Sequence, residues 1–261
     1  MNLVAIMIVR NEESYLPRCL EHLGAQGLKA AVIDNDSTDS TRNILEESDV
    51  VMRIAHAPFN GIFEWQQLLQ QAHDMQQELG ADWLHLNSPD EIFNSNRPGE
   101  RLIDAIQRIE SEGYTAINYN EFVFVPTDEK TNCEGKAFDK LLRHYYFFEP
   151  APIRQMRTWK NIKEISNVKS GGHGLSGADL RIYPENLHLR HYIALSAEQF
   201  RRKYAGRKFP EKELARGWHR NRTNIDTVNL NLPSPDQLKH LAGEDLSILD
   251  NSDPRTKHFW E

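Results

Sequence analysis

Short, uninterrupted apolar runs that alternate with helical patterns constrain the fold of this chain most. The first two runs cover residues 3–9 and 30–33 and consist mainly of Val, Ile and Ala. A continuous apolar run of this length is typical of a strand that is covered on both faces, as in a parallel sheet. Between them, the spacing of apolar residues predicts a helix over 12–23. Strands that alternate with helices predict βαβ units, and hence an α/β domain.

The same alternation continues through the first half of the chain. It predicts further strands at 50–54, 83–86 and 114–125, and further helices at 41–47, 62–79 and 99–112. Beyond residue 126 the pattern becomes irregular, and it predicts a late strand at 187–193 and helices at 196–207 and 210–217. We therefore expect one domain with a mostly parallel central sheet and an irregular, partly helical C-terminal extension.

Composition excludes several classes of protein. The chain has 261 residues and a net charge of -7, from 31 Lys and Arg against 38 Asp and Glu, which argues against a general nucleic-acid binder. Its two cysteines lie far apart and form no zinc or disulfide framework. The apolar run at 3–9 is too short to cross a bilayer and lacks the features of a signal peptide. We expect a soluble, cytoplasmic protein with no integral membrane segment.

Polar clusters follow three of the predicted strands directly. They comprise residues 10–12, 34–39 and 87–91. In open parallel sheets, ligands bind beyond the carboxyl ends of the strands, and these clusters should meet at that edge. The sequence therefore predicts a binding site there.

The cluster at 34–39 has two interpretations. Its Asp, Ser and Thr residues could cap a helix in a surface loop. Alternatively, Asp34 could bond a nucleobase or ribose while the N-terminus of the next helix faces phosphates. No G-x-G-x-x-G follows the first strand, which argues against a dinucleotide-binding fold and disfavours a methyltransferase.

The cluster at 88–91 reads Ser-Pro-Asp-Glu. Its two carboxylates suit a hard divalent cation such as Mg²⁺ or Mn²⁺, which takes oxygen ligands and bridges to phosphates. An acidic pair in a loop can also be solvated and bind nothing. The buried strand predicted at 83–86 favours the metal site, because it would deliver the pair to the sheet edge.

Together these segments resemble a known family. The sequences IVRNEE at 8–13 and VIDNDSTDST at 32–41 closely resemble the first two nucleotide-binding segments of family 2 glycosyltransferases. Residues 83–92 look like the strand that bears the family's D-x-D-E metal motif. The later sequences GGH, LRHY and GWH, at 171–173, 189–192 and 217–219, are similar to a subgroup of these enzymes.

The resemblance implies the single Rossmann-like domain called GT-A and the transfer of a sugar from a nucleotide-diphosphate donor, usually with inversion. Residues 1–125 would form the nucleotide-binding half, 126–231 the half that receives the acceptor and completes the metal site, and 232–261 a tail packed on the surface. The acceptor could be a carbohydrate, a lipid or a small molecule.

The resemblance also implies roles for particular residues. Asp90 would bind Mn²⁺ or Mg²⁺, and His173 or His191 would complete the metal shell. Asp34 would pair with the base of the nucleotide. The residues expected around the nucleotide are Arg10, Asn11, Glu12, Asp34, Asp36 and Ser88.

One residue departs from the family pattern. Ser88 stands where the metal motif has its first aspartate, so one negative charge is lost while a hydroxyl remains for the ribose. We therefore expect weakened metal binding. A catalytically degenerate nucleotide- or sugar-binding protein of the same fold is the alternative function.

The catalytic base and the diphosphate site have several candidates. Carboxylates that could deprotonate an acceptor hydroxyl are Glu91, Glu121 and Glu149, of which we favour Glu91 and Glu149. His173 lies in a glycine loop whose backbone could approach a phosphate, and we include it among the catalytic residues. The basic residues Arg201, Arg202, Lys203, Arg207 and Lys208 could cover a diphosphate or form a solvated helix face.

Overall fold

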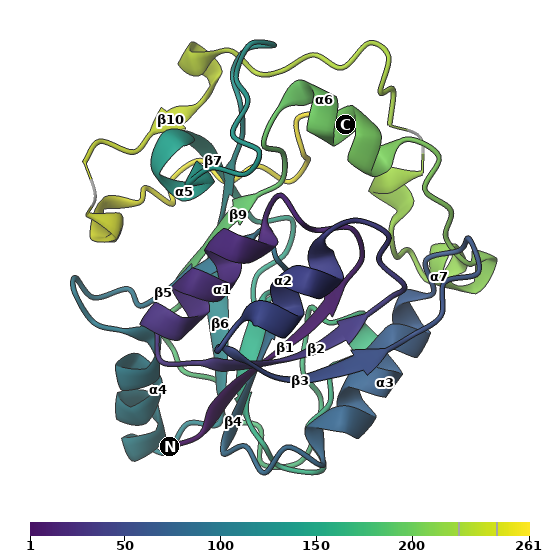
Figure 1. The fold of residues 1–261 in the computed structure, drawn as a ribbon. Coiled ribbons are helices and arrows are strands. Elements are labelled where there is room, and N and C mark those ends of the chain that lie inside the picture. The colour runs from purple at the N-terminus through teal and green to yellow at the C-terminus, as the bar shows by residue number, and fades with distance from the viewer. Residues whose placement is uncertain (224, 244) are drawn as a thin grey trace.

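The computed structural model describes residues 1–223, 225–243 and 245–261. Four parallel strands form its central sheet in the order β3-β2-β1-β4 (Figure 1). Their bounds are Leu3–Val9 for β1, Lys29–Asp34 for β2, Val51–His56 for β3 and Trp83–Asn87 for β4. The predicted α/β class with a parallel central sheet is confirmed.

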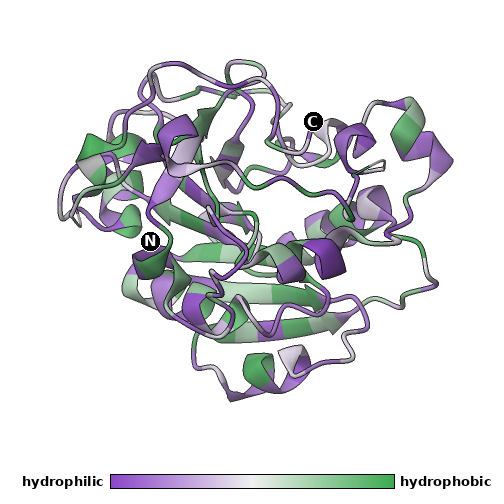
Figure 2. Cartoon of the chain, turned by 90° about the horizontal axis from the view of Figure 1, so that it is seen from above, coloured by the Kyte–Doolittle hydropathy of each residue, from purple (hydrophilic) through white to green (hydrophobic). Residues whose placement is uncertain are grey.

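Four helices cover this sheet on both faces. They are α1 (Leu16–Ala25), α2 (Thr41–Glu47), α3 (Trp65–Gln76) and α4 (Leu102–Ser111). Along β1, Leu3, Ala5 and Met7 pack with α1, α2 and α4, whereas Val4 and Ile6 pack with α3. Both faces of β1 are thus buried, which explains its uninterrupted apolar sequence. Figure 2 shows hydrophobic residues along the strands and a polar outer face on the helices.

The second half of the chain extends the sheet with strands of mixed direction. These are β5 (Glu91–Asn94), β6 (Ala116–Phe124), β7 (His144–Phe148), β8 (Met156–Lys160), β9 (Leu187–Tyr192) and β10 (Lys239–His240). β8 lies between β4 and β6 and is antiparallel to both. β9 runs parallel to β6 and antiparallel to β5. The sequence patterns did not predict β5, β7, β8 or β10.

The remaining helices are short. They are α5 (Phe138–Leu141), α6 (Ala197–Tyr204) and α7 (Glu211–Ala215), with 3-10 turns at Val168–Ser170, Arg220–Arg222, Pro235–Gln237 and Leu246–Ile248. The hydroxyl of Ser196 accepts a hydrogen bond from the backbone N–H of Gln199 at 2.9 Å and so caps α6. Within the described parts of the chain, no helix combines the length and apolarity needed to cross a bilayer.

Helices α1 and α3 begin later than their apolar spacing predicts. α1 starts at Leu16 and not at residue 12. Asn11 has a φ of 54°, and residues 12–15 form a turn in which the backbone N–H of Tyr15 donates to the backbone oxygen of Glu12 at 3.0 Å. A left-handed residue cannot continue into a right-handed helix, so this turn separates the loop after β1 from α1.

The tail from residue 232 is more deeply integrated than a surface tail. β10 pairs with β7, and Arg255 bridges to Phe148. The ring of His258 is only 7% exposed and stacks on Phe148 at a centroid distance of 3.9 Å. In Figure 1 this yellow segment lies above the parallel strands, so the C-terminal residues reach the sheet edge where the site is expected.

Candidate functional site

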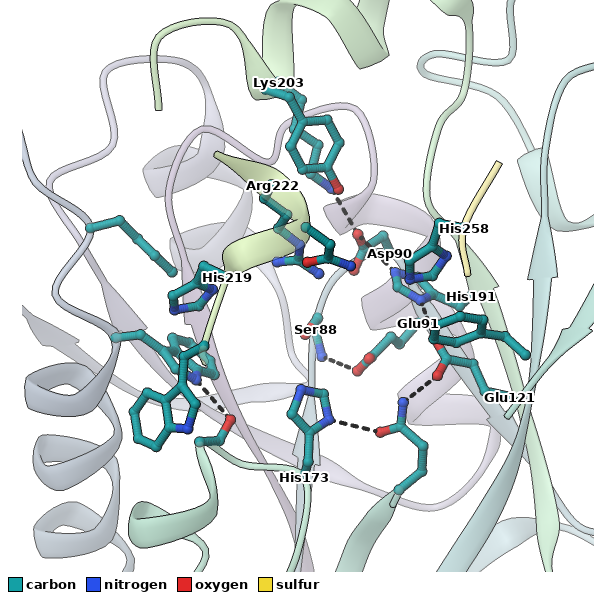
Figure 3. Close-up of a pocket in the computed structure, with 18 of the residues that line it drawn as sticks. Ser88, Asp90, Glu91, Glu121, His173, His191, Lys203, His219, Arg222 and His258 are labelled. Atoms are coloured by element: carbon teal, nitrogen blue, oxygen red, sulfur yellow. Dashed lines mark hydrogen bonds and ion pairs between the residues drawn. The ribbon is translucent and has the colours of Figure 1, made fainter. Parts of the chain in front are cut away.

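A cavity of about 670 Å³ lies at the carboxyl edge of the parallel strands (Figure 3). The strand ends after β1 and β4 contribute to it, as do β5, β6, β8 and β9, the helix α6, and the segments at 217–222 and 256–261. The predicted site residues that line it are Arg10, Glu12, Ser88, Asp90, Glu91, His173 and His191. The structure therefore brings together residues from both halves of the chain at the predicted edge.

The segments at 8–13 and 32–41 are joined to each other by hydrogen bonds. Arg10 donates from Nη1 to the backbone oxygen of Asn35 at 2.6 Å and also bonds the backbone oxygen of Asp36. The Asn11 side chain accepts a bond from the backbone N–H of Thr38 at 2.8 Å. Asn11 and Asp36 both have positive φ, at 54° and 61°, which asparagine and aspartate tolerate better than most residues. The loops after β1 and β2 thus form one unit.

Asp34 caps the turn that follows β2. Its Oδ1 accepts a hydrogen bond from the backbone N–H of Ser37 at 3.1 Å, and the residue is only 4% exposed. This bond closes a turn ahead of α2, whose N-cap residue Ser40 makes no side-chain capping bond, so the predicted helix cap is not formed by Asp34. Asn11, Asp34 and Asp36 lie beside the large cavity and not among the residues that line it.

The centre of the cavity holds a chain of four charged groups (Figure 3). Asp90 Oδ2 accepts a hydrogen bond from Lys203 Nζ at 2.7 Å and lies 3.5 Å from His191 Nε2. On the other side of the imidazole, His191 Nδ1 lies 2.7 Å from Glu121 Oε1. The antiparallel pairing of β5 with β9 places Glu91 opposite His191, and this register brings Asp90 beside the imidazole.

These charges shift one another's pKa values. Burial opposes the charge of His191, but Asp90 and Glu121 outweigh it and raise its pKa to about 10. Burial alone would raise the pKa of Asp90, but Lys203 and His191 hold it well below its usual range. The pKa of Glu12, which faces the same cations, rises to about 7 because its burial outweighs the charge of Lys203.

Asp90 and His191 are the candidate donors for a divalent cation in this cavity. In the described residues, no group of three or more His, Cys, Asp or Glu side chains could hold an ion. Asp90 Oδ2 and His191 Nε2 nevertheless converge, and Mg²⁺ is commonly bound by one or two carboxylates together with substrate phosphates and water. Mn²⁺ accepts the same oxygen ligands. The ammonium of Lys203 at Asp90 shows that this position already accommodates a positive charge.

Glu91 is engaged in the framework of the site. Its Oε1 accepts from Arg157 Nη2 at 2.9 Å, and its Oε2 accepts from the backbone N–H of Ser88 at 3.0 Å. The Glu91 and Arg157 side chains are 3% and 6% exposed. This ion pair therefore fixes the loop that presents Ser88 and Asp90.

His173 lies in the cavity but apart from Asp90. Gly171 and Gly172 precede it with φ of 69° and 87°, and a Cβ on Gly172 would come within 3.0 Å of Leu86. Its Nδ1 faces Gln155 Oε1 at 3.4 Å, and Figure 3 shows the imidazole pointing into the cavity. Burial and nearby arginines lower the pKa of His173 well below its usual range. The structure gives His173 no contact with the Asp90–His191 pair, so it does not complete that ligand set.

Glu149 is the predicted candidate that the structure places elsewhere. It follows β7, and its backbone N–H donates to Arg255 at 2.9 Å. Its neighbours Phe148 and Pro150 line the large cavity, whereas Glu149 does not. Alternation of side chains across an extended segment explains this outcome.

The basic run after residue 200 divides into two groups. Arg201 and Arg202 pair with Glu129 and Glu134, at 2.7 and 2.5 Å, and do not line the cavity. Lys203 and Arg207 do line it, and the Arg207 guanidinium lies 4.2 Å from the centroid of the Phe63 ring. Of the five basic residues predicted to cover a diphosphate, Lys203 and Arg207 are therefore the two that line the cavity.

Several residues of the cavity were not predicted from the sequence. They are Phe63, Trp65, Phe148, Arg154, Gln155, Arg157, Tyr204, Trp218, Arg222 and His258. Arg154 and Arg157 adjoin or lie on β8, a strand that the sequence did not reveal. A signal did exist for Trp218, because it belongs to the GWH sequence in the family-like pattern.

Acidic and basic side chains gathered at the carboxyl edge of a parallel α/β sheet are typical of a ligand-binding site in this class of fold. Residues 4–63 match the model of the family described as Glycosyl transferase family 2. This match confirms the resemblance over residues 4–63, which include the segments at 8–13 and 32–41. No curated protein matches the chain in sequence.

Several solved structures are similar to the chain. TarS from S. aureus is 12% identical, with a TM-score of 0.46, over 78% of this chain and 38% of that one. The TarS 1-349 fragment in complex with UDP-GlcNAc gives 12% and 0.47, over 78% and 64%. Glucosyl-3-phosphoglycerate synthase from Mycobacterium tuberculosis, in complex with Mn²⁺, UDP and glucosyl-3-phosphoglycerate, gives 15% and 0.31, over 47% and 44%. The chain spans less than two thirds of the length of each of these proteins.

Proposed function

We propose that the protein is an inverting glycosyltransferase that moves a sugar from a nucleotide-diphosphate donor to an acceptor hydroxyl. The observation that carries the proposal is the convergence of Asp90 and His191 in a cavity at the carboxyl ends of β1 and β4. The segment that matches the glycosyltransferase family model contributes Arg10 and Glu12 to the same cavity.

The nucleotide would lie over the loops that follow β1 and β2. Asp34 keeps one carboxylate oxygen without a partner in the described part of the chain, and this oxygen could accept a bond from the base. The guanidinium of Arg10 lies 3.6 Å from the centroid of Phe59 and offers a flat cationic surface for stacking. Asn11, Glu12 and Asp36 would adjoin the base and ribose, with the Ser88 hydroxyl reaching the ribose.

The diphosphate would lie against the inner side of α6. Lys203 and Arg207 both line the cavity and could neutralise charge as it develops on the leaving group. Asp90 and His191 would hold a divalent cation, Mn²⁺ or Mg²⁺, which supplies further positive charge to the two phosphates. The loss of the acidic side chain at Ser88 leaves these two protein donors as the ligand set.

His173 is the base that we propose for the acceptor hydroxyl. Glu91 has both oxygens engaged, and Glu149 does not line the cavity. The lowered pKa keeps the His173 imidazole uncharged. Its Nε2 has no partner in the described residues, so this nitrogen is free to accept the hydroxyl proton while Gln155 fixes the ring through Nδ1.

Nucleotide binding tests the proposal. Thermal unfolding of the protein should be recorded with UDP or GDP, with and without Mn²⁺. A ligand at about a hundred times its Kd stabilises the folded state by roughly 2.7 kcal/mol, so the shift is measurable. Asp90→Asn should abolish the metal-dependent part of the shift. Asp139→Asn is the matched control, because Asp139 is buried and paired with Arg18 but lies outside the cavity.

No shift with either nucleotide would contradict the proposal. The alternative function is that of a catalytically degenerate binding protein. The observation that motivates it is the absence of an acidic side chain at Ser88. Hydrolysis of UDP-sugar and GDP-sugar donors in the absence of acceptor separates the two. An active transferase slowly hydrolyses one of the donors, with water in place of the acceptor, and so releases free nucleotide. His173→Asn should reduce the rate of this hydrolysis. A degenerate protein binds the nucleotide but releases none.

A further inference from the structure

The geometry points to Glu121 as a positioning residue that aims His191 at a divalent cation. This inference rests on the proposed function, and it assigns Glu121 a role different from that of a catalytic base. The relevant groups are Asp90, His191 and Glu121, which come from the strand end after β4, from β9 and from β6 (Figure 3).

The two ring nitrogens of His191 face different carboxylates. Nδ1 lies 2.7 Å from Glu121 Oε1, whereas Nε2 lies 3.5 Å from Asp90 Oδ2. The shorter contact is a hydrogen bond in which Nδ1–H donates to the carboxylate. When Nδ1 carries the hydrogen, the Nε2 lone pair of a neutral imidazole is available to a metal. A histidine that binds a metal almost always donates its other N–H to such a partner.

Glu121 is itself held in place. Its Oε2 accepts a hydrogen bond from Arg154 Nη1 at 2.6 Å and another from the Gln155 amide. The residue is 2% exposed, and both of its oxygens are engaged. Glu121 therefore has no oxygen free for an acceptor hydroxyl.

The strand pairing makes this arrangement rigid. β6 and β9 are parallel neighbours, with Glu121 opposite Leu189 and Val123 opposite His191. The two side chains therefore lie two residues apart along the same face of adjacent strands. Glu121 and His191 thus lie on paired strands, which hold side-chain geometry better than loops do.

Mn²⁺ binding in the presence of UDP tests the inference. Electron paramagnetic resonance of free Mn²⁺ gives the affinity, and Glu121→Gln should weaken it by roughly 10- to 100-fold. Asp90→Asn and His191→Asn should weaken Mn²⁺ binding at least as much. Asp139→Asn, a buried carboxylate paired with Arg18 outside the cavity, should leave Mn²⁺ affinity unchanged. Circular dichroism verifies that each variant is folded.

The outcomes separate this inference from the proposed function. If the wild type fails to bind Mn²⁺ with UDP, the metal-dependent function is wrong. If Asp90→Asn and His191→Asn lose Mn²⁺ while folded Glu121→Gln retains full affinity, only the role of Glu121 is wrong.

A measurement on the wild type needs no variant that might misfold. Nitrogen-15 chemical shifts of His191 with Mg²⁺ and UDP should show hydrogen on Nδ1 and none on Nε2. The opposite tautomer would overturn the inference.

A second variant, Glu121→Asp, keeps the negative charge but shortens the side chain. It should bind Mn²⁺ more tightly than Glu121→Gln and more weakly than the wild type.

Discussion

Replacement of Glu91 by Gln distinguishes a structural carboxylate from a catalytic one. Glu91 and Arg157 form an ion pair at 2.9 Å whose side chains are 3% and 6% exposed. Gln keeps an oxygen for the backbone N–H of Ser88 but leaves the buried guanidinium without a counter-charge. Loss of one partner of a buried pair costs about 3–5 kcal/mol, and we expect about 3 kcal/mol because Arg157 retains Gln155 as a partner.

Urea unfolding of the wild type, Glu91→Gln and Glu91→Gln/Arg157→Met measures this cost. The double variant should recover part of the lost stability, because it removes the unpaired charge. The nucleotide turnover of the folded fraction should fall only modestly in Glu91→Gln. A variant with the wild-type urea midpoint and no turnover would refute this reasoning and identify Glu91 as the base.

Three further predictions follow from the charges. Burial raises the pKa of Glu12 to about 7, so its negative charge develops as pH rises through neutrality. That charge repels a diphosphate, and UDP affinity measured by calorimetry should therefore fall between about pH 6 and pH 8. Glu12→Gln should remove this pH dependence. His85 is fully buried, and burial lowers its pKa from 6.5 to about 3. Between these two pH values the unfolded state binds a proton at His85 and the folded state does not. Its contribution to stability is lost as pH falls below 6.5, by about 1.4 kcal/mol per pH unit, and the urea midpoint of His85→Gln should show a shallower acid dependence. Lys203→Gln should bind Mn²⁺ alone more tightly but UDP more weakly, because Lys203 competes with the ion for Asp90. The control Arg201→Gln removes a charge that is paired with Glu129 outside the cavity, and it should change neither affinity. Equal Mn²⁺ affinity in Lys203→Gln and the wild type would contradict this competition.

The parallel half of the fold was predictable because its signals are local. Runs such as 3–9 and 30–33 are apolar without interruption, since helices cover both faces of β1 and β2. Asp90 was predicted as well, because it directly follows a strand with such a signal. In these segments, residues near in sequence determine both the element and its place at the sheet edge.

The antiparallel half depends on partners distant in sequence. β8 reads MRTWK, and its Arg157 is buried beside Glu91, which lies 66 residues away and supplies the opposite charge. A charged residue in a strand otherwise indicates exposure. The role of Glu121 was equally hidden, since its contact with His191 spans 70 residues. Strand propensity depends on such neighbours, and a single sequence does not display them.

The Asp90–Lys203 ion pair connects these observations to the order of ligand binding. Asp90 is 8% exposed, and a buried carboxylate stays ionised only beside a positive charge. Lys203 supplies that charge at 2.7 Å in the structure. A divalent cation at Asp90 and His191 would take over this role and release the ammonium toward a diphosphate in the same cavity. The ion and the donor would then bind cooperatively, because each stabilises the position of Lys203 that favours the other.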